Sequence, residues 1–409
     1  MDIKELLSPS KYKEIYSLYN PYVRIIVLSE IPAGLAAYLF SSFLPLYIKE
    51  IEARMVIVSI FFSLQGIFNM VFAAVSGWQV DRHNRALLQG VFTFLFSGGV
   101  LIIVAQYGNP FLVVAGLIVV SLSVNIVRTA RYSLIVDFVP TERRSSLFGL
   151  INGVGNIFSI AGGVIGGYLL LKTGFTQLFV LISFLVIAAG ILRFFVKDPK
   201  YPKQSKDMGL NFFSGFKAAY KAIFANRILT FLICGDIFIA LGFSTTFNFY
   251  GIYFKDVLFF DYSVVGLLIS IFYSGIAVAS FAGSIVSDRI GHEKALAWSV
   301  LINALFIFAF IHAKSFFYIG IIYFVLGMTG GVYAPNFFTI LGDYSPEEHR
   351  GKIYSIQSIH DSIFLIVAPP VGGFLWDRIY PLSAWYVDLG CTIAAGCVFL
   401  GLLLHTRRR

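Results

Sequence analysis

The sequence predicts an all-α integral membrane protein with twelve transmembrane helices, arranged as two six-helix halves in parallel repeat. Three observations lead to this prediction. The chain of 409 residues is 58% hydrophobic and only 13% charged, whereas soluble globular proteins carry about 25% charged residues. Long apolar segments alternate with short charged clusters along the whole chain. The second half of the sequence also repeats the first half in a single register.

Each long apolar segment meets the length requirement for a transmembrane helix, which is about 20 residues. We expect no cleavable signal before the first segment, and we expect residues 1–21 to form a short amphipathic helix on the cytoplasmic surface. The expected spans are 22–47, 55–78, 86–106, 110–137, 146–171, 176–196, 227–254, 262–286, 295–313, 315–341, 352–376 and 383–405.

The distribution of Lys and Arg predicts the orientation of these spans, because cytoplasmic loops carry an excess of both residues. An even number of spans puts both termini on one side of the membrane. Of the 31 basic residues, two lie inside the fourth span and 23 fall on the side of the termini. The remaining six are Lys49, Arg54, Lys172, Lys255, Lys314 and Arg378. We therefore predict a multi-pass protein of the plasma membrane with both termini in the cytoplasm.

This orientation also accounts for the formal net charge of +9. Because the basic residues lie in loops beside the membrane, the charge indicates no nucleic-acid partner. The three cysteines, Cys234, Cys391 and Cys397, all fall within expected spans. We interpret them as small core residues rather than as disulfide or metal ligands.

The two halves of the sequence match when the chain is shifted by 206 residues. Matched pairs include Asn20 with Asn226, Glu30 with Asp236, Lys49 with Lys255, Asp137 with Asp343, Arg144 with Arg350 and Gly166 with Gly372. The predicted parts are an N-terminal arm (1–21), an N-terminal half (22–196), a cytoplasmic linker (197–226), a C-terminal half (227–405) and a basic tail (406–409). Internal repeats of this kind are typical of secondary transporters, whose substrate sites lie where the repeats meet.

A short charged motif follows the second expected span, and a looser copy follows the eighth. The first copy is GWQVDRHNR at 77–85, and the second is SIVSDRIGHEK at 284–294. The motif resembles the loop signature G-x-x-x-D-R-x-x-R of the major facilitator superfamily, and the resemblance covers essentially the whole chain. It implies alternating access, with this loop latching the two halves on the cytoplasmic side. The latch residues would be Gly77, Asp81, Arg82, Arg85, Asp288 and Arg289.

Charged side chains occur deep inside several expected spans, although spans three, six and nine carry none and Asp388 lies near the outer end of span twelve. The deep residues are Glu30, Arg128, Arg131, Asp236, His360 and Asp361. At a rise of 1.5 Å per residue, they lie about 12–16 Å from the cytoplasmic ends of their helices and form one polar layer. An ionised group at the bilayer centre costs about 2.5–3.5 kcal/mol on insertion scales, so such residues usually mark a functional site.

The acidic members of this layer are candidates for proton coupling. Glu30 and Asp236 occupy matching places in the two halves, and Asp361 follows His360, whose imidazole titrates near neutral pH. We interpret Glu30, Asp236, His360 and Asp361 as a proton-coupling set. Two alternatives stay open, which are a structural pairing of Glu30 with an arginine and a simple interhelical hydrogen bond for His360.

The basic side of the layer lies in the fourth span. Its candidates for substrate binding or charge pairing are Asn125, Arg128, Arg131 and Tyr132. Either one arginine pairs with Glu30, or it binds an anionic group of the substrate. We favour pairing, because the depths match and the charges are opposite. The C-terminal half has Ala334 and Phe337 at the places of the two arginines, so it offers no such partner of its own.

The sequence contains no phosphate-binding loop, dinucleotide fingerprint, metal-spaced Cys/His set or nucleophile motif. We therefore expect no enzyme and neither metal nor cofactor, with a proton gradient as the driving force. The expected protein is a secondary active transporter that works as a monomer in the lipid bilayer and moves a small molecule together with protons.

The direction of transport is predicted from a glycine-rich stretch. GGVIGG at 162–167 resembles the antiporter signature G-P-x-x-G-G, with Gly163 in the place of its proline. The resemblance implies an antiporter, and we favour the export of small organic or amphiphilic compounds. Because the proline is missing, two alternatives stay open. They are proton-coupled uptake of a small polar or anionic solute, and a lipid or lysolipid flippase of the same fold.

Overall fold

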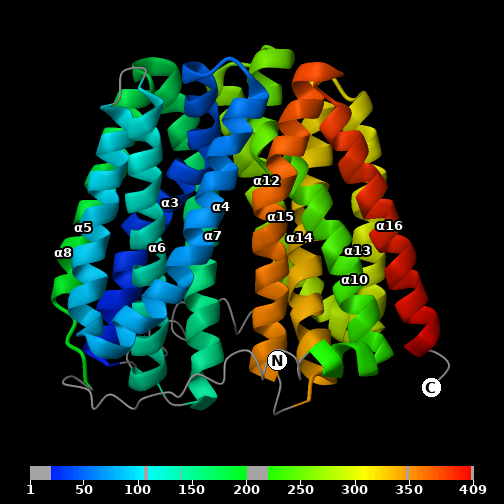
Figure 1. The fold of residues 1–409 in the computed structure, drawn as a ribbon, viewed down its shortest axis with the longest axis horizontal. Coiled ribbons are helices and arrows are strands. Elements are labelled where there is room, and N and C mark those ends of the chain that lie inside the picture. Colours follow the sequence, from blue (N-terminus) through cyan, green and yellow to red (C-terminus); the bar gives the residue numbers. More distant parts are fainter. Residues whose placement is uncertain (1–19, 106–108, 140, 200–219, 347–349, 407–409) are drawn as a thin grey trace. The chain divides into compact units, whose positions relative to one another are not determined.

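The structure is a computed structural model that describes residues 20–105, 109–139, 141–199, 220–346 and 350–406. Each of the twelve expected segments forms a helix there, and the described residues contain no strand, which confirms the all-α class (Figure 1). The expected surface helix at 1–21 falls almost entirely outside the described residues, as do most of the linker and the end of the basic tail.

The helices of the N-terminal half begin and end close to the predicted limits. They are α3 (Pro21–Ile51), α4 (Met55–Arg82), α5 (Arg85–Val104), α6 (Pro110–Phe138), α7 (Thr141–Thr173) and α8 (Phe175–Phe194). Within the described residues of the whole chain, eleven helices are long and apolar enough to cross a membrane. In α7 the apolar part is shorter and covers Ile157–Thr173.

The C-terminal half contains one irregular span and five regular ones. The irregular span consists of α10 (Arg227–Thr246), the 3-10 turn η1 (Phe247–Phe249), α11 (Tyr250–Ile252) and the π-helical turn η2 (Tyr253–Val257). The others are α12 (Tyr262–Ile290), α13 (His292–His312), α14 (Phe316–Tyr344), α15 (Arg350–Arg378) and α16 (Ser383–Thr406). Short π-helical turns are rare and frequently lie at functional sites, so the irregular segment that follows α10 is a candidate functional region.

Asparagine residues cap the first helix of each half. The side chain of Asn20 accepts a hydrogen bond from the backbone N–H of Tyr22 at 3.0 Å, and Asn226 does the same for Ile228 at 3.0 Å. A capping side chain satisfies one of the N–H groups that the first turn leaves without a partner. Because Asn20 and Asn226 match in the repeat, both halves start their first helix in the same way.

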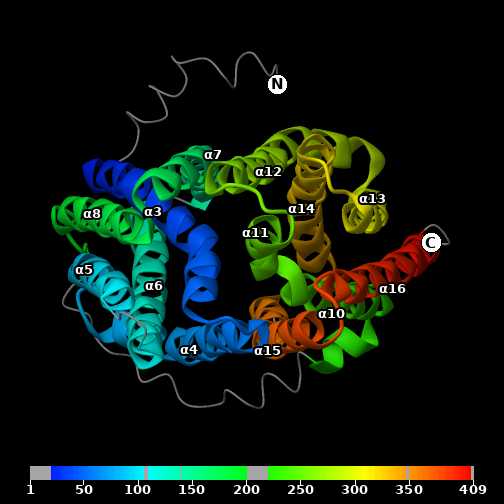
Figure 2. The same ribbon diagram turned by 90° about the horizontal axis from the view of Figure 1, so that it is seen from above.

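Two compact units make up the structure. The first comprises residues 1–38, 71–158 and 176–206, and the second comprises 39–70, 159–175 and 207–409. In the first unit α5 packs along α6, and in the second α12 packs along α14 and α10 along α16 (Figure 2). The second unit thus contains the C-terminal helices together with parts of α3, α4 and α7. The division into halves at the linker stays a prediction.

Glycines permit the close packing of α12 on α14 in the second unit. A Cβ atom on Gly275 would collide with the carbonyl oxygen of Phe324, and one on Gly327 would collide with that of Phe272. Small residues let membrane helices approach closely, since van der Waals contact is a main source of helix association in lipid.

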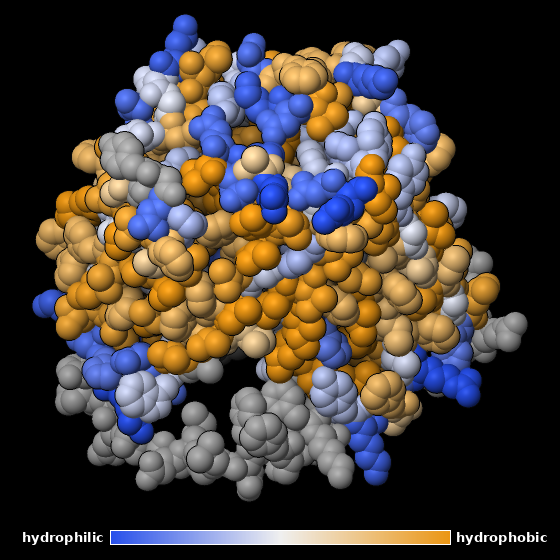
Figure 3. Space-filling view, turned by 45° about the horizontal axis from the view of Figure 1, so that its top comes forward, coloured by the Kyte–Doolittle hydropathy of each residue, from blue (hydrophilic) through white to orange (hydrophobic). Residues whose placement is uncertain are grey.

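Apolar side chains cover much of the outer surface. Figure 3 shows a broad field of hydrophobic residues, with hydrophilic residues gathered toward its ends. Exposed examples from three helices are Phe111, Phe184 and Leu305, and exposure of this kind suits helices whose solvent is lipid. Cys234 and Cys397 are also exposed, so their interpretation as core residues is wrong. Cysteine is only weakly polar and is compatible with a lipid-facing surface.

Candidate functional site

The acid of the first span, Glu30, lies in a buried ion-pair cluster in the first unit. Arg131 of α6 donates to Glu30 Oε2, and Nη2 of Arg193 in α8 donates to Glu30 Oε1 at 2.7 Å. All three residues form these salt bridges with little solvent exposure. The structure therefore shows the favoured pairing for Arg131, and it adds a second arginine to the same carboxylate.

Arg193 was missed by the sequence analysis, which placed no deep charge in the sixth span. Arg193 is 3% exposed, and its guanidinium also donates to Ser29 Oγ at 3.2 Å and to Thr93 Oγ1 at 2.7 Å. Depth was counted from the end of each helix, and Arg193 is the second-last residue of α8. Its long side chain nevertheless reaches Glu30, because arginine can extend its charged head well away from its own backbone.

In the described part of the chain, Arg128 forms no salt bridge with Glu30. Arg128 is exposed, and its Nη2 donates to Asn125 Oδ1 at 3.0 Å. Buried Asn125 also donates to the carbonyl of Ser121 at 2.8 Å. The ring of Tyr132 lies 5.3 Å from the guanidinium carbon of Arg131, which places a cation over an aromatic face. Of the two arginines, Arg128 is the one free of an acidic partner in the described part of the chain.

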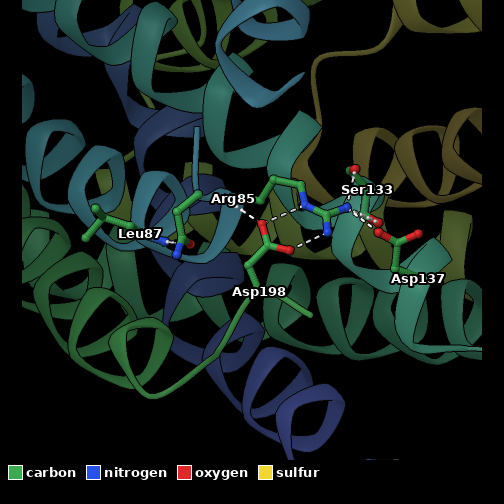
Figure 4. Close-up of polar contacts among 6 residues, drawn as sticks. Arg85, Leu87, Ser133, Asp137 and Asp198 are labelled. Atoms are coloured by element: carbon green, nitrogen blue, oxygen red, sulfur yellow. Dashed lines mark hydrogen bonds and ion pairs between the residues drawn. The ribbon is translucent and has the colours of Figure 1, made fainter. Parts of the chain in front are cut away.

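The last basic residue of the loop signature, Arg85, is an anchor inside the first unit (Figure 4). It is 1% exposed, and its guanidinium donates to Asp198 Oδ2 at 2.8 Å and to Ser133 Oγ at 2.9 Å. It also forms a salt bridge with Asp137. These contacts tie the start of α5 to α6 and to the segment that follows α8. They give Arg85 a structural role within its unit.

The remaining signature residues are largely exposed. Asp81 has no hydrogen bond or ion pair with the described residues, and the guanidinium of Arg82 lies 4.6 Å from the ring centroid of Trp78. Apart from its chain neighbours and its own helix backbone, no atom of the described residues lies within 4 Å of the place where Gly77 would carry a Cβ. In the second copy Asp288 and Arg289 are exposed as well. A latch formed by these residues stays a prediction.

The matching acid of the C-terminal half, Asp236, has neutral partners. It is 6% exposed, and Tyr333 Oη donates to its Oδ1 at 2.7 Å. The amide nitrogen of Gln357 lies 3.4 Å from Oδ2 of Asp236 and also donates to Asp361. Gln357 therefore bridges two carboxylates. No Lys or Arg of the described ranges forms a salt bridge with either acid.

In the C-terminal half, phenylalanines occupy the places that match the two arginine partners of Glu30. With the repeat shift of 206, Arg131 matches Phe337 and Arg193 matches Phe399. Both phenylalanines are buried and pack on Tyr333, with ring centroids 5.7 Å and 6.2 Å from its own. The same positions that neutralise the acid in one half thus orient its tyrosine partner in the other.

Asp236 and Asp361 line a cavity of about 540 Å³ among the helices of the second unit. Its wall is mainly apolar and aromatic, and it carries a third acid. Residues at this wall include Asp236, Asp361, Asp388, Phe243, Phe247 and Tyr323. A mostly apolar cavity with a few convergent polar groups is the usual form of a small-molecule site.

His360 does not share this cavity with its neighbour Asp361. Its Nε2 lies 3.2 Å from Tyr220 Oη, and no hydrogen bond joins His360 to Asp361 in the described residues. Consecutive helical residues point in directions about 100° apart, so adjacency in sequence does not bring their side chains together. A proton relay through His360 therefore has no direct contact to support it.

Apolar spanning helices, buried charges within them and a mainly apolar cavity that carries acids define a membrane transporter rather than an enzyme. The chain belongs to the Major Facilitator Superfamily, whose sequence model matches residues 26–264 and 232–409.

Two curated relatives cover most of the chain. The multidrug resistance protein MdtG of Serratia proteamaculans is 23% identical over 350 residues, which is 83% of each chain. The quinolone resistance protein NorA of Staphylococcus aureus is 22% identical over 364 residues, covering 87% of this chain and 90% of that protein.

Solved transporters share the fold. A variant of the nucleoside transporter NupG superposes with a TM-score of 0.74 at 15% identity, over 92% of this chain and 99% of that one. A bacterial homologue of the iron transporter ferroportin, in an inward-facing state, gives a TM-score of 0.72 at 13% identity, over 93% and 98%. At these identities the similarity concerns the fold alone.

Proposed function

We propose that this chain is a secondary active transporter of the plasma membrane that exports amphiphilic organic cations in exchange for protons. The observation that carries the proposal is the pair Asp236 and Asp361 in a mainly apolar cavity, where their hydrogen-bond donors among the described residues are neutral. A carboxylate in an apolar site needs a positive partner or a proton. A cationic substrate and a proton are therefore alternative partners for the same acids.

This competition between substrate and proton couples the export of the cation to the entry of the proton. A substrate cation binds when the two acids are ionised, with its apolar body against the aromatic wall. A proton that arrives from outside neutralises a carboxylate, removes the attraction and releases the cation. Loss of that proton to the cytoplasm restores the charge for the next substrate. The names of MdtG and NorA, which refer to multidrug and quinolone resistance, support export.

The exposed Arg128 is the observation that favours a second candidate. Its guanidinium has only Asn125 as a partner among the described residues, and a permanent cation in that position suits an anionic solute taken up with protons. Binding assays with cationic and anionic compounds separate the two candidates.

The test uses the purified protein in proteoliposomes with an imposed pH gradient and tetraphenylphosphonium as the cation. We expect gradient-driven accumulation by the wild type and its loss in Asp236→Asn and Asp361→Asn. Asp343→Asn is the matched control, because Asp343 is an exposed acid of the same half and does not line the cavity. Accumulation that ignores the pH gradient, or that survives both cavity substitutions, would refute the proposal.

A further inference from the structure

The cavity of the C-terminal half carries acids at two separate places. Asp236 and Asp361 lie at the first place, and Asp388 of α16 lies at the second. Thr246 Oγ1 donates to Asp388 Oδ2 at 2.8 Å, so Asp388 is attached to the last residue of α10. Asp236 lies ten residues earlier on the same helix. Asp388 also lies beside Gly242, where an added Cβ would come within 2.6 Å of its Oδ1. At 1.5 Å per residue, the two acidic groups are therefore about 9–15 Å apart along α10.

The wall between the two acidic groups is mainly apolar, with Ser244 as a polar residue on the α10 side. Ile239, Ala240 and Phe243 follow Asp236 along α10 before Thr246, and all three line the cavity. The cavity thus offers, in order along one helix, an acid, an apolar surface and a second acid. This order matches a ligand in which an apolar spacer joins two cations.

Helix packing alone does not require an acid at position 388. The matching residue of the N-terminal half is Ile182, which is fully buried. An apolar residue therefore satisfies the packing at this place of the repeat, whereas an ionised acid inside a membrane span is energetically unfavourable.

Asp388 also has acceptor capacity to spare. Thr246 and Thr392, whose Oγ1 lies 3.3 Å from Oδ1, are its hydrogen-bond donors among the described residues. A carboxylate has about four acceptor sites. No Lys or Arg of the described chain forms a salt bridge with it.

We propose that Asp388 is a second cation-binding group of the cavity, and that the cavity selects elongated substrates with a positive group at each end. One cation binds at Asp236 and Asp361, the other binds at Asp388, and the spacer lies along Ile239, Ala240 and Phe243. This inference rests on the proposed cation site at Asp236 and Asp361.

The test compares two ligands that share one alkyl spacer. Decyltrimethylammonium has one cationic end, and decamethonium has two. Each is titrated against labelled tetraphenylphosphonium bound to the wild-type protein in detergent. A second ammonium group in an apolar pocket is unfavourable unless an anion receives it. We therefore expect decamethonium to bind about tenfold or more tighter than decyltrimethylammonium.

Asp388→Asn should remove the advantage of decamethonium and leave the affinity for decyltrimethylammonium within about twofold. The exposed-acid control Asp343→Asn should keep the advantage. Equal or weaker binding of decamethonium by the wild type would overturn the inference, and so would an advantage that survives Asp388→Asn. The wild-type comparison decides the matter even where the substituted protein does not fold.

Direct titration of decyltrimethylammonium, without the tetraphenylphosphonium probe, separates this inference from the proposed function. If Asp236→Asn leaves decyltrimethylammonium binding intact, the proposed cation site itself fails. If that binding is lost in Asp236→Asn while decamethonium has no advantage in the wild type, only the role of Asp388 fails.

Discussion

The two halves of the chain hold matching acids in opposite ways. Glu30 is neutralised by Arg131 and Arg193, whereas Asp236 receives hydrogen bonds from Tyr333 and Gln357. The helices and their caps repeat, but Phe337 and Phe399 stand in the C-terminal half where the N-terminal half has Arg131 and Arg193. The comparison teaches that the fold keeps the position of the acid while the neighbouring residues decide its chemistry. One acid is held in an ion-pair cluster, and the other lines a cavity.

The largest expected effect comes from breaking the N-terminal cluster. Glu30→Gln leaves the partly buried Arg131 and the buried Arg193 without their shared anion, and breaking a buried ion pair from one side costs about 3–5 kcal/mol. We expect a loss of this size in the free energy of unfolding, measured with denaturant in detergent micelles. Adding Arg131→Gln to Glu30→Gln should recover part of the loss.

Arg128→Ala serves as the control for this prediction. Because Arg128 is exposed and bonds only to Asn125 among the described residues, its removal should change stability by about 0.5 kcal/mol or less. If the losses of unfolding free energy for Glu30→Gln and Arg131→Gln simply add in the double variant, the result would contradict the ion-pair cluster.

A smaller effect is expected from the two copies of the loop signature. Arg85 bonds Asp137, Asp198 and Ser133 in the first copy. In the second copy His292 stands at the corresponding place, and its Nδ1 lies 2.7 Å from Asn336 Oδ1. Arg85→Lys keeps the charge but loses the planar fork that serves several acceptors. It should cost about 1.5–3 kcal/mol, as expected for hydrogen bonds to charged groups.

His292→Ala should cost about 0.5–1.5 kcal/mol, since it removes one hydrogen bond. Denaturant unfolding of both variants checks this order. A larger loss for His292→Ala than for Arg85→Lys would show that the second copy, not the first, anchors its unit.

The smallest effect on stability is expected at the C-terminal acid. Tyr333→Phe removes one donor to Asp236 and should cost about 0.5–1.5 kcal/mol. Asp236→Asn should change stability no more than this, because it removes a charge that has no ionic partner in the described residues. Both variants are measured as for the N-terminal cluster.

Ligand stabilisation sharpens this contrast between the two acids. A ligand that binds the folded state raises the melting temperature by mass action. Tetraphenylphosphonium should therefore stabilise the wild type and Tyr333→Phe but not Asp236→Asn. If Asp236→Asn destabilises the protein as strongly as Glu30→Gln, the two halves do not differ in the way inferred here.

The sequence by itself determined the class of the protein, the limits of its spans and the repeat. These are local properties, because the length of an apolar segment and the charges that bound it depend on neighbouring residues alone. The match of Glu30 with Asp236 and the two copies of the loop motif followed from comparing the two halves of the sequence in one register.

Only the tertiary structure decided which residues share a site. Arg193 reaches Glu30 from the last turn of α8, and Asp388 of α16 lines the cavity and accepts a hydrogen bond from Thr246 of α10. In the same way, His360 points away from the cavity that its neighbour Asp361 lines. Depth along a single helix says nothing about lateral neighbours or rotation about the helix axis. Those depend on how the helices pack, and packing brings together residues more than a hundred positions apart.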